Sequence, residues 1–221
     1  MSVAIFDLDN TLLAGDSDHA WGEFLVRHEL ADAETHARHN DAFYRQYTEG
    51  KLDIDAYVKF TLGPVLHLSL PELNNLHKKF MEEFIMPMIL PAARELIDSH
   101  KAKGHQCLIM SATNSFITHP IAAELGVRNI LSTDLETRDN HYTGRISGVP
   151  CFQRGKVTRF RLWLETQGQV PDVATAFFYS DSYNDVPLLE TVGNPVAVDP
   201  DPRLAKLANE KNWRVISLRA G

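Results

Sequence analysis

The sequence predicts an α/β protein, with a Rossmann-like three-layer core around a parallel sheet and an inserted helical domain. Two observations favour this fold. After residue 91, short apolar runs alternate with helix-like segments, which implies a parallel sheet with right-handed crossovers. Between residues 16 and 90, helix-like segments follow one another without a convincing strand. We therefore expect a core of residues 1–15 and 88–221 and a helical insertion of residues 16–87.

Composition limits the possible classes of protein. The 221 residues fit one domain with a modest insertion, and 44% hydrophobic with 23% charged residues is typical of a soluble globular protein. A net charge of -7 argues against a nucleic-acid or membrane-surface binder. No apolar run is long enough to span a bilayer, and the N-terminus lacks signal-peptide features. Two cysteines make no disulfide framework, so we expect a reduced, cytoplasmic enzyme.

The first apolar run, residues 3–6, predicts a buried strand and is followed at once by Asp7-Leu8-Asp9-Asn10-Thr11. Parallel strands deliver reactive groups at their carboxyl ends. Because side chains alternate along an extended chain, Asp7 and Asp9 would point the same way. Two adjacent carboxylates need a positive partner, and Mg²⁺ prefers such oxygen ligands. Taken alone, the pattern also fits an Asp- and Asn-rich turn.

The insertion begins with Asp16-Ser17-Asp18, residue types that favour a helix N-cap. Apolar residues then recur at helical spacing, which predicts amphipathic helices. Gly50 and Gly63-Pro64 would end two of these helices. The expected helices cover residues 21–28, 31–47, 54–62 and 71–84.

In the rest of the chain, turn residues mark the ends of the elements. Pro91 in a first turn and Gly104 after the last bound one helix, and Asp139-Asn140 predicts a β-hairpin over residues 134–147. We expect strands at residues 106–110, 129–132, 174–180, 195–198 and 214–217, and helices at residues 91–103, 114–125, 155–166, 184–191 and 202–210.

Three further motifs carry polar residues. Ser111-Ala112-Thr113-Asn114 follows one strand, Arg154-Gly155-Lys156 opens a helix, and Asp181-Ser182-Tyr183-Asn184-Asp185 follows another strand. The order is an aspartate pair, a hydroxyl, a lysine and a second aspartate pair. In these motifs the chain resembles the haloacid dehalogenase superfamily, particularly its phosphoserine-phosphatase-like branch. The resemblance runs from residue 7 to residue 185 and implies that the insertion is a cap over the active site.

The resemblance implies a Mg²⁺-dependent phosphatase that hydrolyses a small phosphate monoester. Asp7 would be the nucleophile, and the aspartyl-phosphate it forms splits one hard step into two. Asp9 would protonate the leaving oxygen and then activate water. The metal ligands would be Asp7, Asp181 and, through its backbone carbonyl, Asp9. Asp185, which lies one helical turn after Asp181 if the helix has begun there, would hold metal-bound water, and Asn184 would contact that water or the phosphate.

Three more residues would bind the phosphate. Ser111 and the backbone N–H of Ala112 would donate hydrogen bonds to phosphate oxygens, aided by the helix start at Asn114. Lys156 would neutralise the phosphoryl oxygens and Asp7. Taken alone, the serine motif is typical of a helix cap, and a lysine after glycine is typical of a surface.

The substrate is expected to be a small phosphorylated amino alcohol or amino acid. In the family's phosphoserine phosphatases an acid shortly after the first motif holds the substrate ammonium, and Asp16 stands at that place. Those enzymes hold the substrate carboxylate with an arginine of the cap, for which Arg45 is the candidate. Related proteins act on histidinol phosphate, which carries an amine and no carboxylate. The cap length favours a metabolite over a phosphoprotein.

Other functions stay open. A phosphotransferase or phosphomutase would use the same aspartyl-phosphate. A response-regulator receiver also combines an acidic Mg²⁺ site, a hydroxyl and a lysine, but Asp9 and the long insertion argue against it. A zinc site at His36 and His39, which could share a helix face, lacks a cysteine or carboxylate partner. We interpret these histidines as structural or surface residues.

Overall fold

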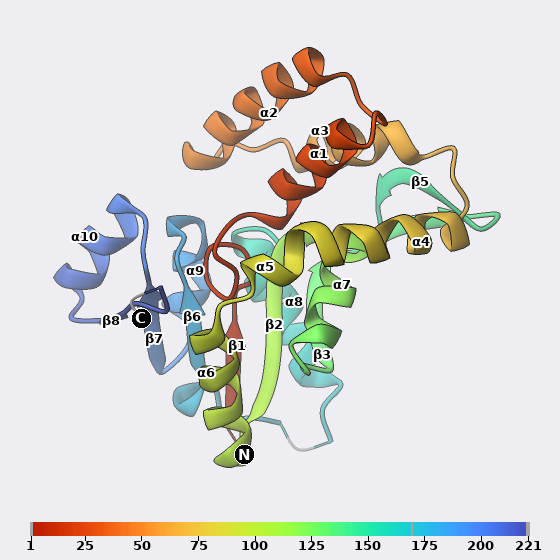
Figure 1. The fold of residues 1–221 in the computed structure, drawn as a ribbon. Helices are drawn as coiled ribbons and strands as arrows, with labels where there is room; N and C mark the ends of the chain where they lie inside the picture. Colours follow the sequence, from red (N-terminus) through yellow and green to blue (C-terminus); the bar gives the residue numbers. More distant parts are fainter. Residues whose placement is uncertain (1, 169, 220–221) are drawn as a thin grey trace.

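A six-stranded parallel sheet forms the centre of the protein (Figure 1). The computed structural model describes residues 2–168 and 170–219. Strand β1 lies inside the sheet and is buried on both faces, which explains its unbroken apolar sequence. The strand order is β3 (Asn129–Thr133), β2 (Gln106–Asn114), β1 (Val3–Phe6), β6 (Phe177–Ser180), β7 (Asn194–Val198), β8 (Arg214–Ile216).

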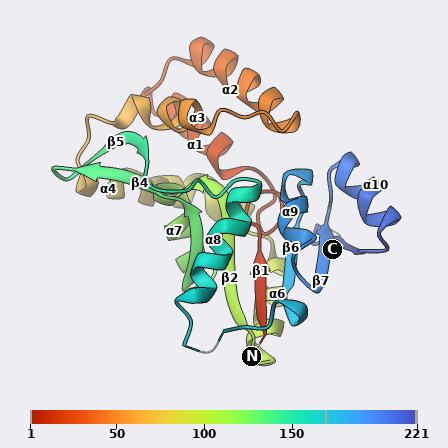
Figure 2. The ribbon, with the colours of Figure 1, turned by 180° about the vertical axis from the view of Figure 1, so that it is seen from behind.

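Helices cover both faces of this sheet. Ala4 and Phe6 belong to one buried cluster with α6 (Pro91–Ala102) and α7 (Ser115–Glu124). Val3 and Ile5 belong to the opposite cluster, with α8 (Arg154–Glu165), α9 (Val186–Leu189) and α10 (Pro202–Glu210). Figure 2 shows the α8 side in front. The predicted three-layer α/β core is therefore confirmed.

The insertion is helical and lies over the carboxyl ends of the strands (Figure 1). The β4–β5 hairpin, Leu135–Arg138 and His141–Ile146, projects from the core toward it, and Leu70 N–H donates to the Asn140 carbonyl at 2.9 Å. The cap therefore contacts the β4–β5 hairpin of the core as well as the strand ends. Its elements are α1 (Ser17–Arg27), α2 (Ala33–Thr48), α3 (Ile54–Leu62), α4 (Leu70–Phe80), a π-helical segment (Met81–Ile85) and α5 (Met86–Met88).

Two elements differ from the sequence prediction in ways that affect the site. Strand β2 continues to Asn114 instead of ending at residue 110, so Ser111 lies on the strand. The helix expected over residues 184–191 begins as a 3-10 turn, Tyr183–Asp185, and only then becomes α9, with Pro187 in its first turn. In the part of the chain that the structure describes, no helix is both long and apolar enough to cross a membrane.

Candidate active site

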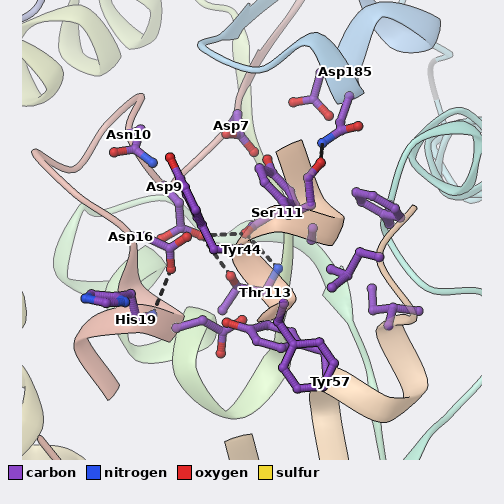
Figure 3. A pocket seen from close by; sticks show the side chains of 18 of the residues that line it. Asp7, Asp9, Asn10, Asp16, His19, Tyr44, Tyr57, Ser111, Thr113 and Asp185 are labelled. Atoms are coloured by element: carbon purple, nitrogen blue, oxygen red, sulfur yellow. Dashed lines mark hydrogen bonds between the residues drawn. The ribbon is translucent and has the colours of Figure 1, made fainter. Parts of the chain in front are cut away.

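The strand register brings the polar motifs to one edge of the sheet. Phe6 pairs with Ile109 on one side and with Tyr179 on the other. The residues that follow therefore emerge side by side under the cap, where they line a pocket (Figure 3). The core contributes Asp7, Asp9, Asn10, Ser111, Ala112, Thr113, Phe152, Lys156, Asn184 and Asp185, and the cap contributes Asp16, Asp18, His19, Asn40, Phe43, Tyr44, Tyr47, Leu52, Ile54 and Tyr57.

Lys156 joins two of the motifs. Its ammonium lies 2.7 Å from Oδ1 of Asp7 and 2.7 Å from Oδ2 of Asp185. The lysine side chain is 2% exposed. Burial alone would lower the pKa of Lys156, but the carboxylates of Asp185 and Asp7 outweigh it and hold the pKa well above its usual value. The first turn of α8 thus supplies a permanent cation to the strand ends.

The carboxylates at this edge carry more negative charge than one lysine can balance. Burial raises the pKa of Asp7 to about 7, although Lys156 opposes the shift. Burial, then the charges of Asp7 and Asp185, raise the pKa of Asp181 well above its usual value. The Thr11 hydroxyl donates to Oδ1 of Asp181 at 3.1 Å and holds it beside Asp7. Such an excess of hard oxygen ligands fits a divalent cation such as Mg²⁺.

Within the described residues, no group of three or more His, Cys, Asp and Glu side chains is arranged to hold a metal ion. The expected magnesium set has two carboxylates and one backbone carbonyl, so it does not require such a group. His36 and His39 both pack on Phe60, with ring centroids at 4.8 and 5.5 Å. Their contacts fit the structural interpretation of these histidines.

Asp9 lies in the turn after β1 and points into the pocket (Figure 3). Its Oδ1 accepts the backbone N–H of Ser17 at 2.7 Å. Its Oδ2 accepts the hydroxyls of Thr113, at 2.8 Å, and Ser111, at 3.2 Å. Three donors therefore fix this carboxylate between the strand edge and the first turn of α1.

Thr113 is a site residue that the sequence interpretation missed. Because β2 continues past Met110, Ser111 and Thr113 share one side of an extended strand. The two-residue spacing of Ser111 and Thr113 could have predicted that both line the site. The sequence prediction missed this because it ended the strand at residue 110. Ser111 itself is buried, and its Oγ accepts the Thr113 N–H at 3.1 Å. Ala112 lines the same pocket.

Asp185 does not lie one helical turn beyond Asp181, because the chain forms a 3-10 turn at this point. Its Oδ2 accepts the Ser180 hydroxyl at 2.7 Å in addition to the Lys156 ammonium. The predicted contact with metal-bound water stays a prediction. Asn184 lines the pocket, and its amide also donates to the Tyr47 carbonyl of the cap at 3.0 Å. Its predicted contact with metal-bound water or phosphate stays a prediction.

Asp16 is both a helix cap and a pocket residue. Its Oδ1 accepts the His19 N–H at 2.9 Å, which makes it the N-cap of α1. It also lines the pocket. Burial, and next the charge of Asp9, raise its pKa to about 6. The neighbouring pocket residue Asp18 is 6% exposed and was interpreted from the sequence only as a helix-start residue.

The structure corrects the expectation for Arg45. This residue is exposed on α2 and is not among the described residues that line the pocket. A helix turns once in about 3.6 residues, so positions spaced by three and four share a face. The face of α2 that reaches the pocket carries Asn40, Phe43, Tyr44 and Tyr47.

These features define an α/β protein with a parallel sheet and a carboxylate-rich pocket beneath a helical cap. The model of the haloacid dehalogenase-like hydrolase family matches residues 4–190, and the chain belongs to this family. A histidinol-phosphatase of Neisseria meningitidis serogroup C is 46% identical over 220 residues, 99% of each chain. Phosphoserine phosphatase SerB1 of Mycobacterium tuberculosis is 33% identical over 227 residues, 99% of this chain and 71% of the relative.

Among solved structures, a protein with unknown function from Bordetella pertussis Tohama I has the same fold. It is 42% identical and superimposes with a TM-score of 0.90, covering 98% of each chain. The predicted superfamily is thus confirmed, as is the prediction of an enzyme of the phosphatase class.

Proposed function

We propose that the protein is a Mg²⁺-dependent phosphatase that hydrolyses a small, amine-bearing phosphate monoester through an aspartyl-phosphate, with histidinol phosphate as its substrate. The observation that carries this proposal is that the two sides of the pocket carry different polar groups. Lys156 and the hydroxyls of Ser111 and Thr113 lie at its core side, and the carboxylates of Asp16 and Asp18 lie at its cap side. A molecule with a phosphate at one end and a cation at the other matches this arrangement.

In the proposed reaction, a carboxylate oxygen of Asp7 attacks phosphorus while the bond from phosphorus to the ester oxygen breaks. Asp9 gives its proton to the departing oxygen. It then takes a proton from the water that attacks the aspartyl-phosphate, which releases inorganic phosphate and restores Asp7. Ser111 and the N–H of Ala112 donate to the phosphoryl oxygens, and Lys156 balances their charge.

The metal belongs to the same proposal. Phosphatases of this family generally use Mg²⁺. Asp7, Asp181 and the backbone carbonyl of Asp9 would hold it. The carboxylates of Asp7 and Asp181 support this assignment, because both contact the Thr11 hydroxyl. When bound, Mg²⁺ supplies positive charge to the phosphoryl oxygens and to the carboxylates around them.

The small number of cationic side chains in the pocket favours histidinol phosphate over phosphoserine as the substrate. Phosphoserine carries a carboxylate that needs a cationic partner. Among the described pocket residues, only Lys156 and His19 can be cations, and Lys156 already contacts Asp7 and Asp185. Arg45 lies outside the pocket. The relative named histidinol-phosphatase supports this choice, and the relative named phosphoserine phosphatase supports phosphoserine as the alternative.

The test is steady-state hydrolysis of histidinol phosphate, phosphoserine and p-nitrophenyl phosphate with Mg²⁺ present. We expect the highest kcat/KM for histidinol phosphate, with all phosphate recovered as inorganic phosphate. A higher kcat/KM for phosphoserine would replace the proposed substrate. Transfer of the phosphoryl group to added alcohols in preference to water would indicate a phosphotransferase.

The Asp7→Asn variant is the matched control. It preserves side-chain size but removes the nucleophilic carboxylate, so turnover of all three substrates should vanish. Trapping of a fluoroberyllate adduct, which mimics the aspartyl-phosphate, should vanish as well. Substantial turnover by this variant would remove Asp7 as the nucleophile.

A further inference from the structure

We infer that Asp18, with Tyr57 in the wall of the same pocket, is a specificity-determining residue that binds the nitrogen-containing aromatic ring of the substrate. This inference rests on the proposed function and deepens it. Asp16 would take the substrate ammonium, and Asp18 would accept a hydrogen bond from a ring N–H. The site would thus select phosphate esters of amino alcohols that carry a heteroaromatic group.

The first observation is a buried carboxylate without a cation. Asp18 lines the pocket at the first turn of α1 and is 6% exposed. Its hydrogen-bonding neighbours are the amide of Asn114, 3.4 Å from Oδ1, and the hydroxyl of Thr113. In the part of the chain that the structure describes, no Lys, Arg or His forms an ion pair with it. Burial, and next the charges of Asp16 and Asp9, raise the pKa of Asp18 well above its usual value. An N–H donor from a ligand would favour the ionised carboxylate, so Asp18 has capacity for such a donor.

The position of Asp18 is fixed by its neighbours. Asn114 is the N-cap of α7, and its Oδ1 accepts the Ile117 N–H at 3.3 Å. Its amide nitrogen is therefore directed away from α7 and toward Asp18. The Thr113 hydroxyl donates its single proton to Oδ2 of Asp9 at 2.8 Å. Asp18 is thus held between the first turn of α1 and the start of α7.

The second observation is an aromatic wall on the cap side of the pocket. Helix α2 contributes Phe43, Tyr44 and Tyr47, and helix α3 contributes Tyr57. The rings of Phe43 and Tyr57 are 5.2 Å apart in an edge-on arrangement. Figure 3 shows Tyr57 at the opposite end of the pocket view from Asp7 and Asp185. Tyr47 reaches the other end, where its hydroxyl donates to Ser182 at 3.0 Å. The faces of Phe43 and Tyr57 suit an aromatic ring at the Tyr57 end.

Tyr57 also has a free polar group. Within the described residues, the Tyr57 hydroxyl has no hydrogen-bond partner, although the side chain lines the pocket. Tyr57 and Asp18 line the same pocket, and the charges of Asp18, Asp16 and Asp9 add to burial in raising the pKa of Tyr57. A ring nitrogen between them would have a carboxylate on one side and a hydroxyl on the other.

A pair of substrates isolates ring recognition. Histidinol phosphate carries phosphate, amine and imidazole, whereas 2-aminopropyl phosphate keeps the phosphate and the amine but lacks the ring. Asp18→Asn should lower kcat/KM for histidinol phosphate by roughly 10- to 100-fold, as expected for loss of a charge-assisted hydrogen bond. The loss on 2-aminopropyl phosphate should be much smaller, so the preference for the ring-bearing ester should collapse.

Two further variants complete the experiment. Tyr57→Phe keeps the aromatic face and should reduce kcat/KM for histidinol phosphate selectively, by about 2- to 10-fold. It tests the inference even if Asp18→Asn folds poorly. Asp55→Asn is the control, because Asp55 is also an acidic residue in the first turn of a cap helix but is exposed. It should leave both substrates unaffected.

The outcomes separate this inference from the proposed function. If the unaltered enzyme hydrolyses both esters equally well, histidinol phosphate is not its specific substrate, and both proposals fall. If it prefers histidinol phosphate and both variants keep that preference, only the inference falls. Equal losses on the two esters, with a lower Tm, would make Asp18 a structural residue and would also overturn it.

Discussion

The side-chain amide of Asn184 donates a hydrogen bond of 3.0 Å to the backbone carbonyl of Tyr47, which joins the loop after β6 to the last turn of α2. The last carbonyls of a helix lack partners within it. Two other side chains of the core donate hydrogen bonds to carbonyls at the end of α2. Arg203 donates to the Thr48 carbonyl at 3.1 Å, and Gln153 donates to the Gly50 carbonyl at 3.0 Å. Core side chains thus hold the cap over the pocket.

Removing one of these bonds should loosen the cap. Gln153 donates to Gly50 and, at 3.2 Å, to Oδ1 of Asn184. Each such bond contributes about 0.5–1.5 kcal/mol. We expect Gln153→Ala to lower kcat/KM by up to about tenfold and to speed amide hydrogen exchange in α2, with β1 unchanged. Gln167→Ala, beyond the other end of α8, is the control. Unchanged exchange in α2 would show that Gln153 does not hold the cap.

The role of Asp9 can be tested through the leaving group. If Asp9 protonates the departing oxygen, Asp9→Asn should slow alkyl phosphates by roughly 100- to 10,000-fold. The loss on p-nitrophenyl phosphate should be far smaller, because nitrophenolate departs without a proton. The comparison is kcat on both ester types, with Asp7→Asn as the variant that should lose both. Equal losses for Asp9→Asn would rule out the acid role.

Metal binding should appear in stability as well as in turnover. A ligand that binds only the folded state stabilises it by about 2.7 kcal/mol at one hundred times its Kd. We expect Mg²⁺ to raise Tm, a chelator to abolish turnover, and Ca²⁺ to substitute poorly because it accepts a looser shell than Mg²⁺. Asp181→Asn should remove most of the Mg²⁺-dependent rise in Tm. Full turnover in the chelator would contradict the magnesium site.

The pH dependence of amine recognition follows from Asp16. Burial and the charge of Asp9 raise its pKa to about 6, so the group loses its proton as pH rises through that value. Only the ionised form attracts an ammonium, and kcat/KM reports the free enzyme. The ratio of kcat/KM for 2-aminopropyl phosphate to that for propyl phosphate should therefore rise with pH up to about 6 and then level off.

The control for this profile is Asp16→Asn. Asparagine is an equally good N-cap, so α1 keeps its start while the titrating charge is lost. The ratio should become low and independent of pH. A ratio that still rises near pH 6 in this variant would assign the titration to another group.

Sequence alone was enough to predict the core and the motif residues that it carries. Apolar runs ending in Asp7, Ser111 and Asp181 are local patterns, and parallel strands bring their carboxyl ends to one edge. The predicted juxtaposition therefore followed from periodicity and chain order. Lys156 was predicted at the same edge from motif order, and its 2.7 Å contact with Asp7 agrees with that expectation.

Only the tertiary structure decided which cap residues line the pocket. The rotation of α2 about its axis depends on its packing against other helices, so Arg45 could not be excluded from the pocket in advance. Asp18 was interpreted as a helix-start residue because its neighbours Thr113 and Asn114 lie almost a hundred residues away in sequence. Contacts between distant elements have no local pattern, whereas strand ends and helix caps do.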